Sequence, residues 1–313
     1  MPKKYVATAY GDPAQVLEFV DFDVQEPGPH QVVVSTRAIG MNPADFKTIR
    51  GQMGADESRL PLPIGFEAAG AVTAVGAHAS TAAGPIAVGD DVIVYRAAGS
   101  YADTLLADDS TVFGRPAELD VEHAAGLLLV GVTAADLVRT AGVGADDVVL
   151  VHGGSGAVGA IAVQLAVTAG ATVIATAGEA NLDHVRALGA IPVTYGDGLL
   201  ERVRDVAPGR ITAVLDTVGN DEAIDTSLQL VDNPGKIVSI AGFGRAADGI
   251  VLLNGSTQQS QANRRAAIGG LIDDAAAGTL VTEVAKTFPL ADAPAALDEL
   301  ATAHPRGKFI LLP

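Results

Sequence analysis

The sequence feature that most constrains the fold is a glycine-rich segment that directly follows an apolar run. Residues 148–152 read Val-Val-Leu-Val-His, and residues 153–159 read Gly-Gly-Ser-Gly-Ala-Val-Gly. The second segment contains G-x-G-x-x-G at 154, 156 and 159, and a helix-forming stretch follows it. A strand, a glycine turn and a helix in this order are typical of the first βαβ unit of a doubly wound parallel sheet. The order therefore predicts an α/β fold around this segment.

Each glycine of such a turn has its own expected role. Gly154 is expected to permit the tight turn, Gly156 to let the backbone approach a pyrophosphate, and Gly159 to let the helix pack on the strand. The helix N-terminus offers unpaired N–H groups and a positive dipole end to the phosphates. The alternative is a glycine-rich turn that binds no ligand. We predict that the dinucleotide-binding residues here are Gly154, Ser155, Gly156, Ala157, Val158 and Gly159.

The region around this turn alternates between strand and helix patterns. Further β-branched runs follow the first one, and stretches of helical character separate them. The strands are expected at 148–152, 172–176, 191–194, 213–216 and 236–240, and the helices at 156–169, 182–188, 199–206 and 223–230. This alternation predicts a Rossmann domain over residues 123–255.

The flanking sequence has a different texture. Residues 5–117 consist of short apolar runs separated by Gly, Pro and Asp, as at 31–36 and 91–95, which indicates an irregular, mostly antiparallel β domain. The tail holds an amphipathic stretch at 294–303 and a strand at 307–312 that needs a sheet to join. We expect it to join the first domain, which then comprises residues 1–122 and 256–313.

Composition excludes several functional classes. The 313 residues include no cysteine, so the chain has no disulfide, thiol nucleophile or Cys-based metal site. The formal net charge of −17 repels phosphate backbones and anionic membranes, so neither nucleic acid nor a membrane is an expected partner. The N-terminus enters strand-like sequence without the apolar stretch of a secretory signal, and we expect a cytoplasmic protein.

The end of the second expected strand bears on the choice of cofactor. An acidic residue there would bind the ribose of NAD and repel the extra phosphate of NADP. Residues 173–178 read Val-Ile-Ala-Thr-Ala-Gly and carry no acid, although Glu179 follows and no Arg or Lys is adjacent. Thr176, Gly178 and Asn181 are candidate donors to that phosphate, so the sequence favours NADPH.

Several motifs taken in order give the chain a family resemblance over nearly its full length. It resembles the zinc-independent quinone oxidoreductases and alkenal/one reductases of the medium-chain dehydrogenase/reductase superfamily. Besides the glycine turn, the motifs are Gly-Met-Asn-Pro-Ala-Asp-Phe-Lys at 40–47, Pro-Ile-Gly-Phe-Glu-Ala-Ala-Gly at 63–70, Gly-Ser-Tyr-Ala at 99–102, Leu-Asp-Thr-Val-Gly at 215–219 and Arg-Gly-Lys at 306–308. The resemblance implies a GroES-like catalytic domain beside the Rossmann domain, and a homodimer.

The resemblance also implies a reaction without metal. The superfamily's alcohol dehydrogenases bind a catalytic zinc through Cys and His, and this chain has Asn42 and Phe66 at those places. Without a Lewis acid, oxidation of a simple alcohol is difficult, whereas hydride addition to a conjugated acceptor remains feasible. The implied substrate is therefore a small quinone or an α,β-unsaturated carbonyl compound.

Asn42 and Lys47 are the candidate catalytic residues. Asn42 is expected to contact the substrate oxygen, with a structural role in the Asn-Pro turn as the alternative. Lys47 is expected to donate to the developing oxyanion or to contact the cofactor, with an ordinary exposed lysine as the alternative. Asp45 and Glu67 look like residues that hold the cleft together.

Matching family segments give further cofactor candidates near the nicotinamide. They are Thr133, Val218, Gly219, Ala241 and Gly242, and for Val218 and Gly219 the alternative is plain turn chemistry at a strand end. Two competing functions remain: a reductase of another small carbonyl compound, and a non-catalytic NADPH-binding protein. The intact glycine motif argues against the second.

Overall fold

The computed structural model describes residues 1–303 and 305–313, and the chain forms two compact units. One unit comprises Met1–Leu129 and Ile272–Pro313, and the other comprises Val130–Leu271. The sequence predicted boundaries after residues 122 and 255, and both lie earlier in the chain than the boundaries after Leu129 and Leu271 in the structure. The first boundary lies later because the helix α3 (Val121–Ala125) contacts strands of the first unit. The second lies later because the helix α9 (Gln258–Ala276), which the sequence analysis did not predict, packs its first turns against α4 (Leu128–Ala141) through side-chain hydrogen bonds.

The first unit is built on antiparallel strands, as its sequence predicted. Strands β2 (Leu17–Asp21), β1 (Lys3–Ala7) and β4 (Leu62–Pro63) form a three-stranded sheet. The larger sheet has the order β10-β8-β5-β3-β18-β17, with β9 also paired to β3. Its strands are β3 (Gln31–Gly40), β5 (Glu67–Val75), β8 (Asp91–Tyr95), β9 (Thr104–Asp108), β10 (Val112–Gly114), β17 (Val284–Pro289) and β18 (Lys308–Leu312).

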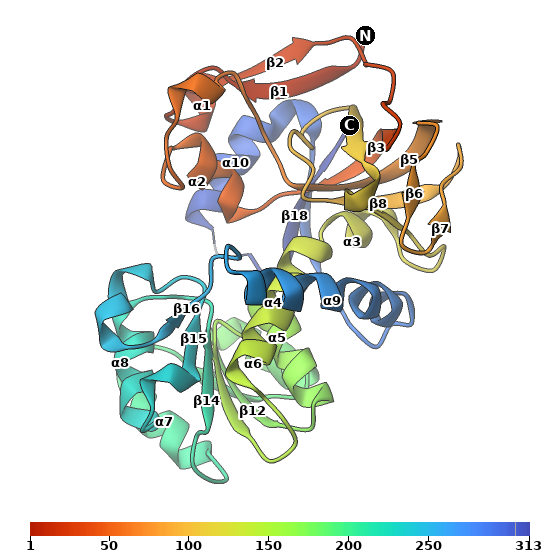
Figure 1. Cartoon of the computed structure of the whole chain (residues 1–313). Coiled ribbons are helices and arrows are strands. Elements are labelled where there is room, and N and C mark those ends of the chain that lie inside the picture. Colours follow the sequence, from red (N-terminus) through yellow and green to blue (C-terminus); the bar gives the residue numbers. More distant parts are fainter. Residues whose placement is uncertain (304) are drawn as a thin grey trace. The chain divides into compact units, whose positions relative to one another are not determined.

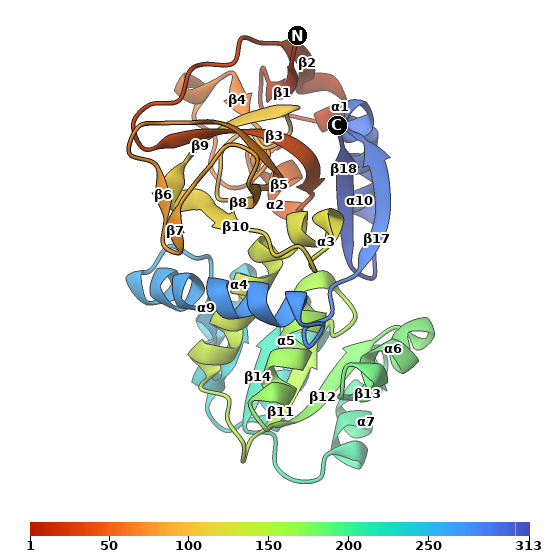
Figure 2. The ribbon, with the colours of Figure 1, turned by 90° about the vertical axis from the view of Figure 1, so that its right-hand side faces the viewer.

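The C-terminal strand joins this sheet as expected. Strand β18 pairs antiparallel with β3, with Ile310 opposite Gly40, and parallel with β17 (Figure 2). Its residues Lys308–Leu311 are buried. The unit's helices are α1 (Pro13–Val16), α2 (Pro43–Ile49), α3 (Val121–Ala125) and α10 (Ala293–Thr302), and the short β6 (Ser80–Thr81) and β7 (Gly84–Pro85) form a separate pair.

The second unit is a six-stranded parallel sheet in the order β13-β12-β11-β14-β15-β16. The strands are β11 (Val148–His152), β12 (Thr172–Ala177), β13 (Ile191–Thr194), β14 (Ala213–Asp216), β15 (Ile237–Ser239) and β16 (Val251–Leu252). Helices α7 (Leu199–Val206) and α8 (Asp221–Leu230) lie on one side of the sheet and α5 (Ala157–Thr168) on the other (Figure 1). This order is that of a doubly wound Rossmann sheet, so the α/β prediction is confirmed.

The outer elements complete this unit. Helix α6 (Leu182–Ala187) contacts β12 and β13. Strand β16 adds one more parallel strand to the five that the sequence predicted, beside β15. No helix within the described residues is long and apolar enough to cross a membrane.

Candidate functional site

The glycine turn follows β11, and its glycines are required for different reasons. The left-handed backbone conformation belongs to Gly153, with φ +78°, and not to Gly154. A Cβ on Gly154 would lie 2.7 Å from the Ala175 Cβ of β12, so Gly154 is required by the neighbouring strand. Gly154 lies inside the turn, which the hydrogen bond from Gly156 N to Gly153 O closes at 3.0 Å.

Gly159 and Gly156 occupy very different surroundings. A Cβ on Gly159 would lie 2.0 Å from the Gly153 carbonyl oxygen, so glycine is required where the helix meets the turn. A Cβ on Gly156 would meet only the Gly153 oxygen, at an ordinary 3.4 Å, and Gly156 has φ −76°. The fold itself therefore leaves room for a side chain at Gly156. The space that a side chain at Gly156 would fill is suited to a pyrophosphate group.

The start of α5 has the features of an anion site. Gly156 is the N-cap residue and no side chain caps this N-terminus. Ser155, Gly156, Ala157 and Val158 are all partly exposed. The first N–H groups of the helix are thus accessible to phosphate oxygens, and the helix dipole favours negative charge there.

The end of β12 carries the residues expected to choose between the two cofactors. Thr176 is buried beneath the turn, where its Oγ1 accepts from Gly153 N at 3.0 Å and its carbonyl oxygen from Gly154 N at 2.8 Å. Thr176 thus shapes the glycine turn from below. Gly178 and Asn181 are partly exposed beyond it.

Sequence reasoning missed Tyr195 at this place. Its side chain is 61% exposed, and its hydroxyl would lie 3.3 Å from a Cβ on Gly178. The phenol therefore stands beside the strand end where the second phosphate of NADP is expected. Tyr195 directly follows β13, and the pairing of β12 with β13 brings it beside the end of β12.

Two turns at the ends of β14 and β15 are tied together by one carboxylate. Asp216 Oδ1 accepts from Val218 N and Gly219 N, both at 3.0 Å, and Asp216 Oδ2 accepts from Ser239 Oγ. Ser239 Oγ in turn accepts from Ala241 N at 3.1 Å and Gly242 N at 2.8 Å. The four predicted residues of these turns are thus brought together.

The contact between these turns is close. Gly219 has φ +74°, and a Cβ on it would lie 2.4 Å from the Ala241 carbonyl carbon. Val218 and Phe243 are 45% and 50% exposed. Asp216 lies within a sequence motif, whereas its hydrogen bond to Ser239, which positions both turns, has no signal in the sequence.

A neutral histidine lies under the sheet's carboxyl edge. His152 is buried, and its Nε2 is 3.0 Å from Ser227 Oγ, which donates its own hydrogen to Ala223 O. The hydroxyl must therefore accept from the imidazole, which places the histidine proton on Nε2. Burial lowers the pKa of His152 to about 4, against a smaller opposing effect of Asp216.

In the first unit, Asn42 belongs to a buried network. Its Nδ2 donates to Glu67 Oε1 at 3.0 Å and to Gly40 O at 3.3 Å, and its Oδ1 accepts from Lys308 Nζ at 2.5 Å. Lys308 Nζ also donates to Met41 O and, at 3.0 Å, to Glu67 Oε1. Both amide hydrogens of Asn42 are thus donated within the protein, in keeping with the structural alternative for this residue.

Asp45 lies one helical turn further on. Its Oδ2 accepts from Asn42 N at 2.7 Å and from Tyr101 Oη at 2.8 Å, while its Oδ1 is buried without a partner. Burial raises the pKa of Asp45 to about 7, outweighing these hydrogen bonds and the attraction of Lys308. Burial and the neighbouring Asp45 also raise the pKa of Tyr101. Asp45 and Glu67 thus accept hydrogen bonds from other side chains of the first unit.

The remaining predicted residues differ in exposure. Lys47, on α2, is exposed. Thr133, on α4, is partly buried and accepts from Arg264 Nη1 at 3.1 Å. Phe66 is half-buried just before β5. Across the described residues, no three His, Asp or Glu side chains are grouped so as to hold a metal ion.

Two family models match the chain. Residues 28–116 match the alcohol dehydrogenase GroES-like domain, and residues 157–272 match the zinc-binding dehydrogenase domain. The two matches fall on the antiparallel unit and on the parallel sheet with its helices, in agreement with the architecture.

Individual relatives agree with these matches. A quinone oxidoreductase of Pseudomonas aeruginosa is 32% identical over 100% of both chains. A chloroplastic NADPH-dependent alkenal/one oxidoreductase of Arabidopsis thaliana is 31% identical over 77% of this chain and 64% of its own. The crystal structure of Escherichia coli quinone oxidoreductase complexed with NADPH superimposes with a TM-score of 0.85 at 26% identity, covering 99% of this chain and 100% of the other.

Proposed function

Because the chain belongs to the quinone and enone oxidoreductases of the medium-chain dehydrogenase/reductase superfamily, we propose that it reduces small quinones or α,β-unsaturated carbonyl compounds with NADPH. The observation that carries this proposal is the free space at Gly156, at the uncapped start of α5. The fold does not need glycine there, whereas a bound pyrophosphate does. When bound, NADPH supplies hydride from its nicotinamide.

The choice of NADPH follows from the groups at the end of β12. No carboxylate closes this strand, and Tyr195 and Asn181 present polar groups where the extra phosphate would lie. Glu179 is exposed and lies one residue beyond Gly178. We propose that Gly178, Asn181 and Tyr195 bind the phosphate, while Thr176 holds the glycine turn in place.

We further propose that the reaction proceeds without zinc. The oxygen of Asn42 and a carboxylate oxygen of Glu67 already accept from the buried Lys308 ammonium. A divalent cation beside Asn42 would meet this positive charge at short range, where the repulsion is several kcal/mol even at an effective dielectric of about 20. Turnover is therefore expected to survive prolonged treatment with phenanthroline. Its loss, with recovery on adding zinc, would contradict this part of the proposal.

Lys47 is our candidate donor to the substrate oxygen. It is exposed in the last turn of α2, whereas Asn42, the N-cap residue of that helix, has both amide hydrogens engaged. Contact between Asn42 and substrate therefore requires an exchange of hydrogen bonds, and we propose that Asn42 mainly fixes the start of α2. Lys47→Ala should lower kcat and leave the Kd of NADPH unchanged. Arg59→Ala, at another exposed cation, is the control.

Steady-state kinetics test the overall proposal. NADPH oxidation is measured with quinones, enones, enals and simple aldehydes, and kcat/KM is compared between NADPH and NADH. We expect turnover with conjugated acceptors, weak activity with simple aldehydes, and a clear preference for NADPH. Equal efficiency with NADH would refute the cofactor assignment, and inactivity with every acceptor despite NADPH binding would favour a non-catalytic binder.

We also propose a cytoplasmic homodimer. Among the described strands, β16 pairs only with β15, so the outer edge of the parallel sheet offers backbone groups to a second chain. Light scattering after gel filtration is expected to give about twice the 31.6 kDa of one chain. A monomeric mass at micromolar concentration would contradict the dimer.

A further inference from the structure

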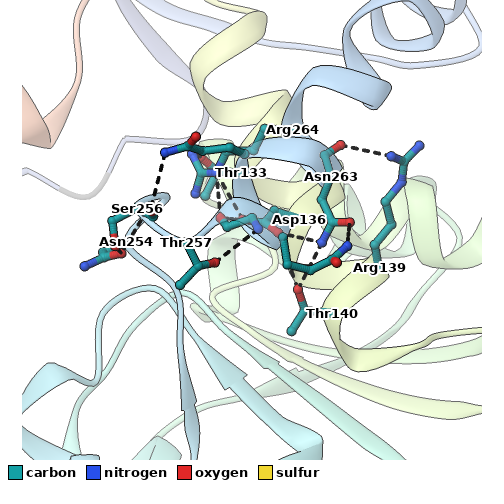
Figure 3. Close-up of polar contacts among 12 residues, drawn as sticks. Thr133, Asp136, Arg139, Thr140, Asn254, Ser256, Thr257, Asn263 and Arg264 are labelled. Carbon is teal, nitrogen blue, oxygen red and sulfur yellow. Dashed lines mark hydrogen bonds and ion pairs between the residues drawn. The ribbon is translucent and has the colours of Figure 1, made fainter.

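A buried polar cluster joins α4 to α9 in the second unit. Asp136 of α4 is fully buried, and its carboxylate accepts from four side chains of the two helices. The donors are Arg264 Nε and Asn263 Nδ2, both at 3.0 Å, Thr140 Oγ1 at 3.3 Å, and Ser260 Oγ. Figure 3 shows Arg264, Asn263 and Thr140 around Asp136. The carboxylate thus holds Arg264 in one orientation.

Arg264 uses only part of its guanidinium in this cluster. Its Nε donates to Asp136, and its Nη1 donates to Thr133 Oγ1 at 3.1 Å. Its Nη2 donates to no residue that the structure describes, and the side chain keeps 13% exposure. Because the guanidinium is a rigid fork, a carboxylate that fixes Nε also fixes the direction of Nη2. The fork therefore presents a charged donor to a ligand.

The guanidinium lies against the turn that leaves β16. A Cβ on Gly255 would lie 3.2 Å from Arg264 Cζ, and Gly255 has φ +78°, so the turn needs glycine there. Leu253 N donates to Ser239 O at 2.9 Å, which places the start of this turn beside the end of β15. In Figure 3, Arg264 and Thr133 lie together near Ser256 of the same turn. Arg264 thus stands at the carboxyl edge of the parallel sheet.

The position of Arg264 on the sheet indicates which half of the cofactor it faces. A Rossmann sheet binds one nucleotide on each half, with the pyrophosphate at the first glycine turn. That turn follows β11, and the end of β12 carries the groups for the adenosine phosphate. The nicotinamide half must then lie over β14, β15 and β16. Its carboxamide oxygen is an acceptor that requires a donor at that end.

We propose that Arg264 recognises the nicotinamide half of NADPH by donating from Nη2 to the carboxamide oxygen, with Asp136 and Thr133 fixing the guanidinium. This inference rests on the proposed function. It assigns a positioning role to Asp136 and gives Thr133 its place beside the nicotinamide. The sequence does not single out Arg264 as a cofactor residue, since it is one of two adjacent arginines in a polar stretch.

The test compares whole cofactor with its adenosine half. Arg264→Lys keeps the charge and one hydrogen bond to Asp136 but removes the fork. Calorimetric titrations measure Kd for NADPH and for 2′,5′-ADP, which lacks the nicotinamide. We expect Arg264→Lys to weaken NADPH binding at least about tenfold and to leave 2′,5′-ADP binding unchanged. Arg265→Lys, the exposed neighbour on α9, should change neither.

Each other outcome has a definite meaning. If Arg264→Lys weakens both ligands equally, the cluster only supports the fold and the inference is wrong. If it weakens neither and instead raises the KM of the acceptor, the guanidinium contacts substrate and the inference is also wrong. Failure of the parent protein to bind 2′,5′-ADP would overturn the cofactor site itself. Asp136→Asn, which keeps the guanidinium but removes its anchor, should weaken NADPH selectively and serves if Arg264→Lys does not fold.

Discussion

Replacing Asp45 by asparagine should change how the stability of the first unit depends on pH. Asp45 is 1% exposed, and burial raises its pKa from 3.8 to about 7. Between these pH values the folded protein keeps a proton that the unfolded chain has released. The free energy of unfolding therefore falls as pH rises from about 4 through 7, by about 4 kcal/mol in total.

The asparagine variant lacks this dependence but carries a cost of its own. Its side-chain oxygen can accept from Asn42 N and Tyr101 Oη as Asp45 Oδ2 does. Its NH2 group then occupies the place of Oδ1, where no described group accepts a hydrogen bond, at a cost of about 1–3 kcal/mol at any pH. We expect the variant to be less stable than the parent at pH 5.5. The difference should shift in the variant's favour by about 2 kcal/mol between pH 5.5 and pH 8.

Urea unfolding followed by far-UV circular dichroism measures this shift, since the chain has no tryptophan to serve as a probe. Asp197→Asn, at an exposed aspartate, controls for the change of net charge. Infrared difference spectroscopy supplies a second readout, because the parent should show the carbonyl stretch of a protonated carboxyl group at pH 6 that the variant lacks. A stability difference that stays constant between the two pH values would refute the reasoning.

Three other changes test the remaining sites. Because the pKa of His152 is lowered to about 4, the unfolded chain binds a proton at a higher pH than the folded protein does. The free energy of unfolding therefore falls by about 3 kcal/mol as pH drops from 6.5 through 4. His152→Gln should abolish this loss in urea titrations. Gly156→Val should keep the parent's circular dichroism and Tm but weaken NADPH binding at least tenfold. In contrast, Gly159→Ala should lower Tm, because its Cβ would lie 2.0 Å from a carbonyl oxygen. Tight NADPH binding by folded Gly156→Val would exclude this turn as the cofactor site. Lys308→Met should destabilise the first unit by about 3–5 kcal/mol in urea, because Glu67 would remain buried without its cation, and a loss below 1 kcal/mol would argue against that network.

The sequence alone determined the architecture of the parallel sheet. Strands β11, β13 and β14 begin and end at the predicted residues, and the glycine turn stands between β11 and α5 as expected. These features are local, because a buried strand, a turn and a helix each have a periodicity that consecutive residues carry. The sequence failed at α9, where glutamines and a Gly-Gly pair obscure the helical pattern.

Only the tertiary structure decided how the site is held. It joined Asn42 and Glu67 to Lys308 from the far end of the chain, and Asp136 to Arg264, through buried hydrogen bonds that no spacing in the sequence encodes. It also showed that Gly153, and not Gly154, takes the left-handed conformation. A buried polar group must find its partner wherever the fold brings one within about 3 Å. The motifs therefore gave candidate residues for the site, whereas the hydrogen-bond partners of those residues depended on contacts between distant segments.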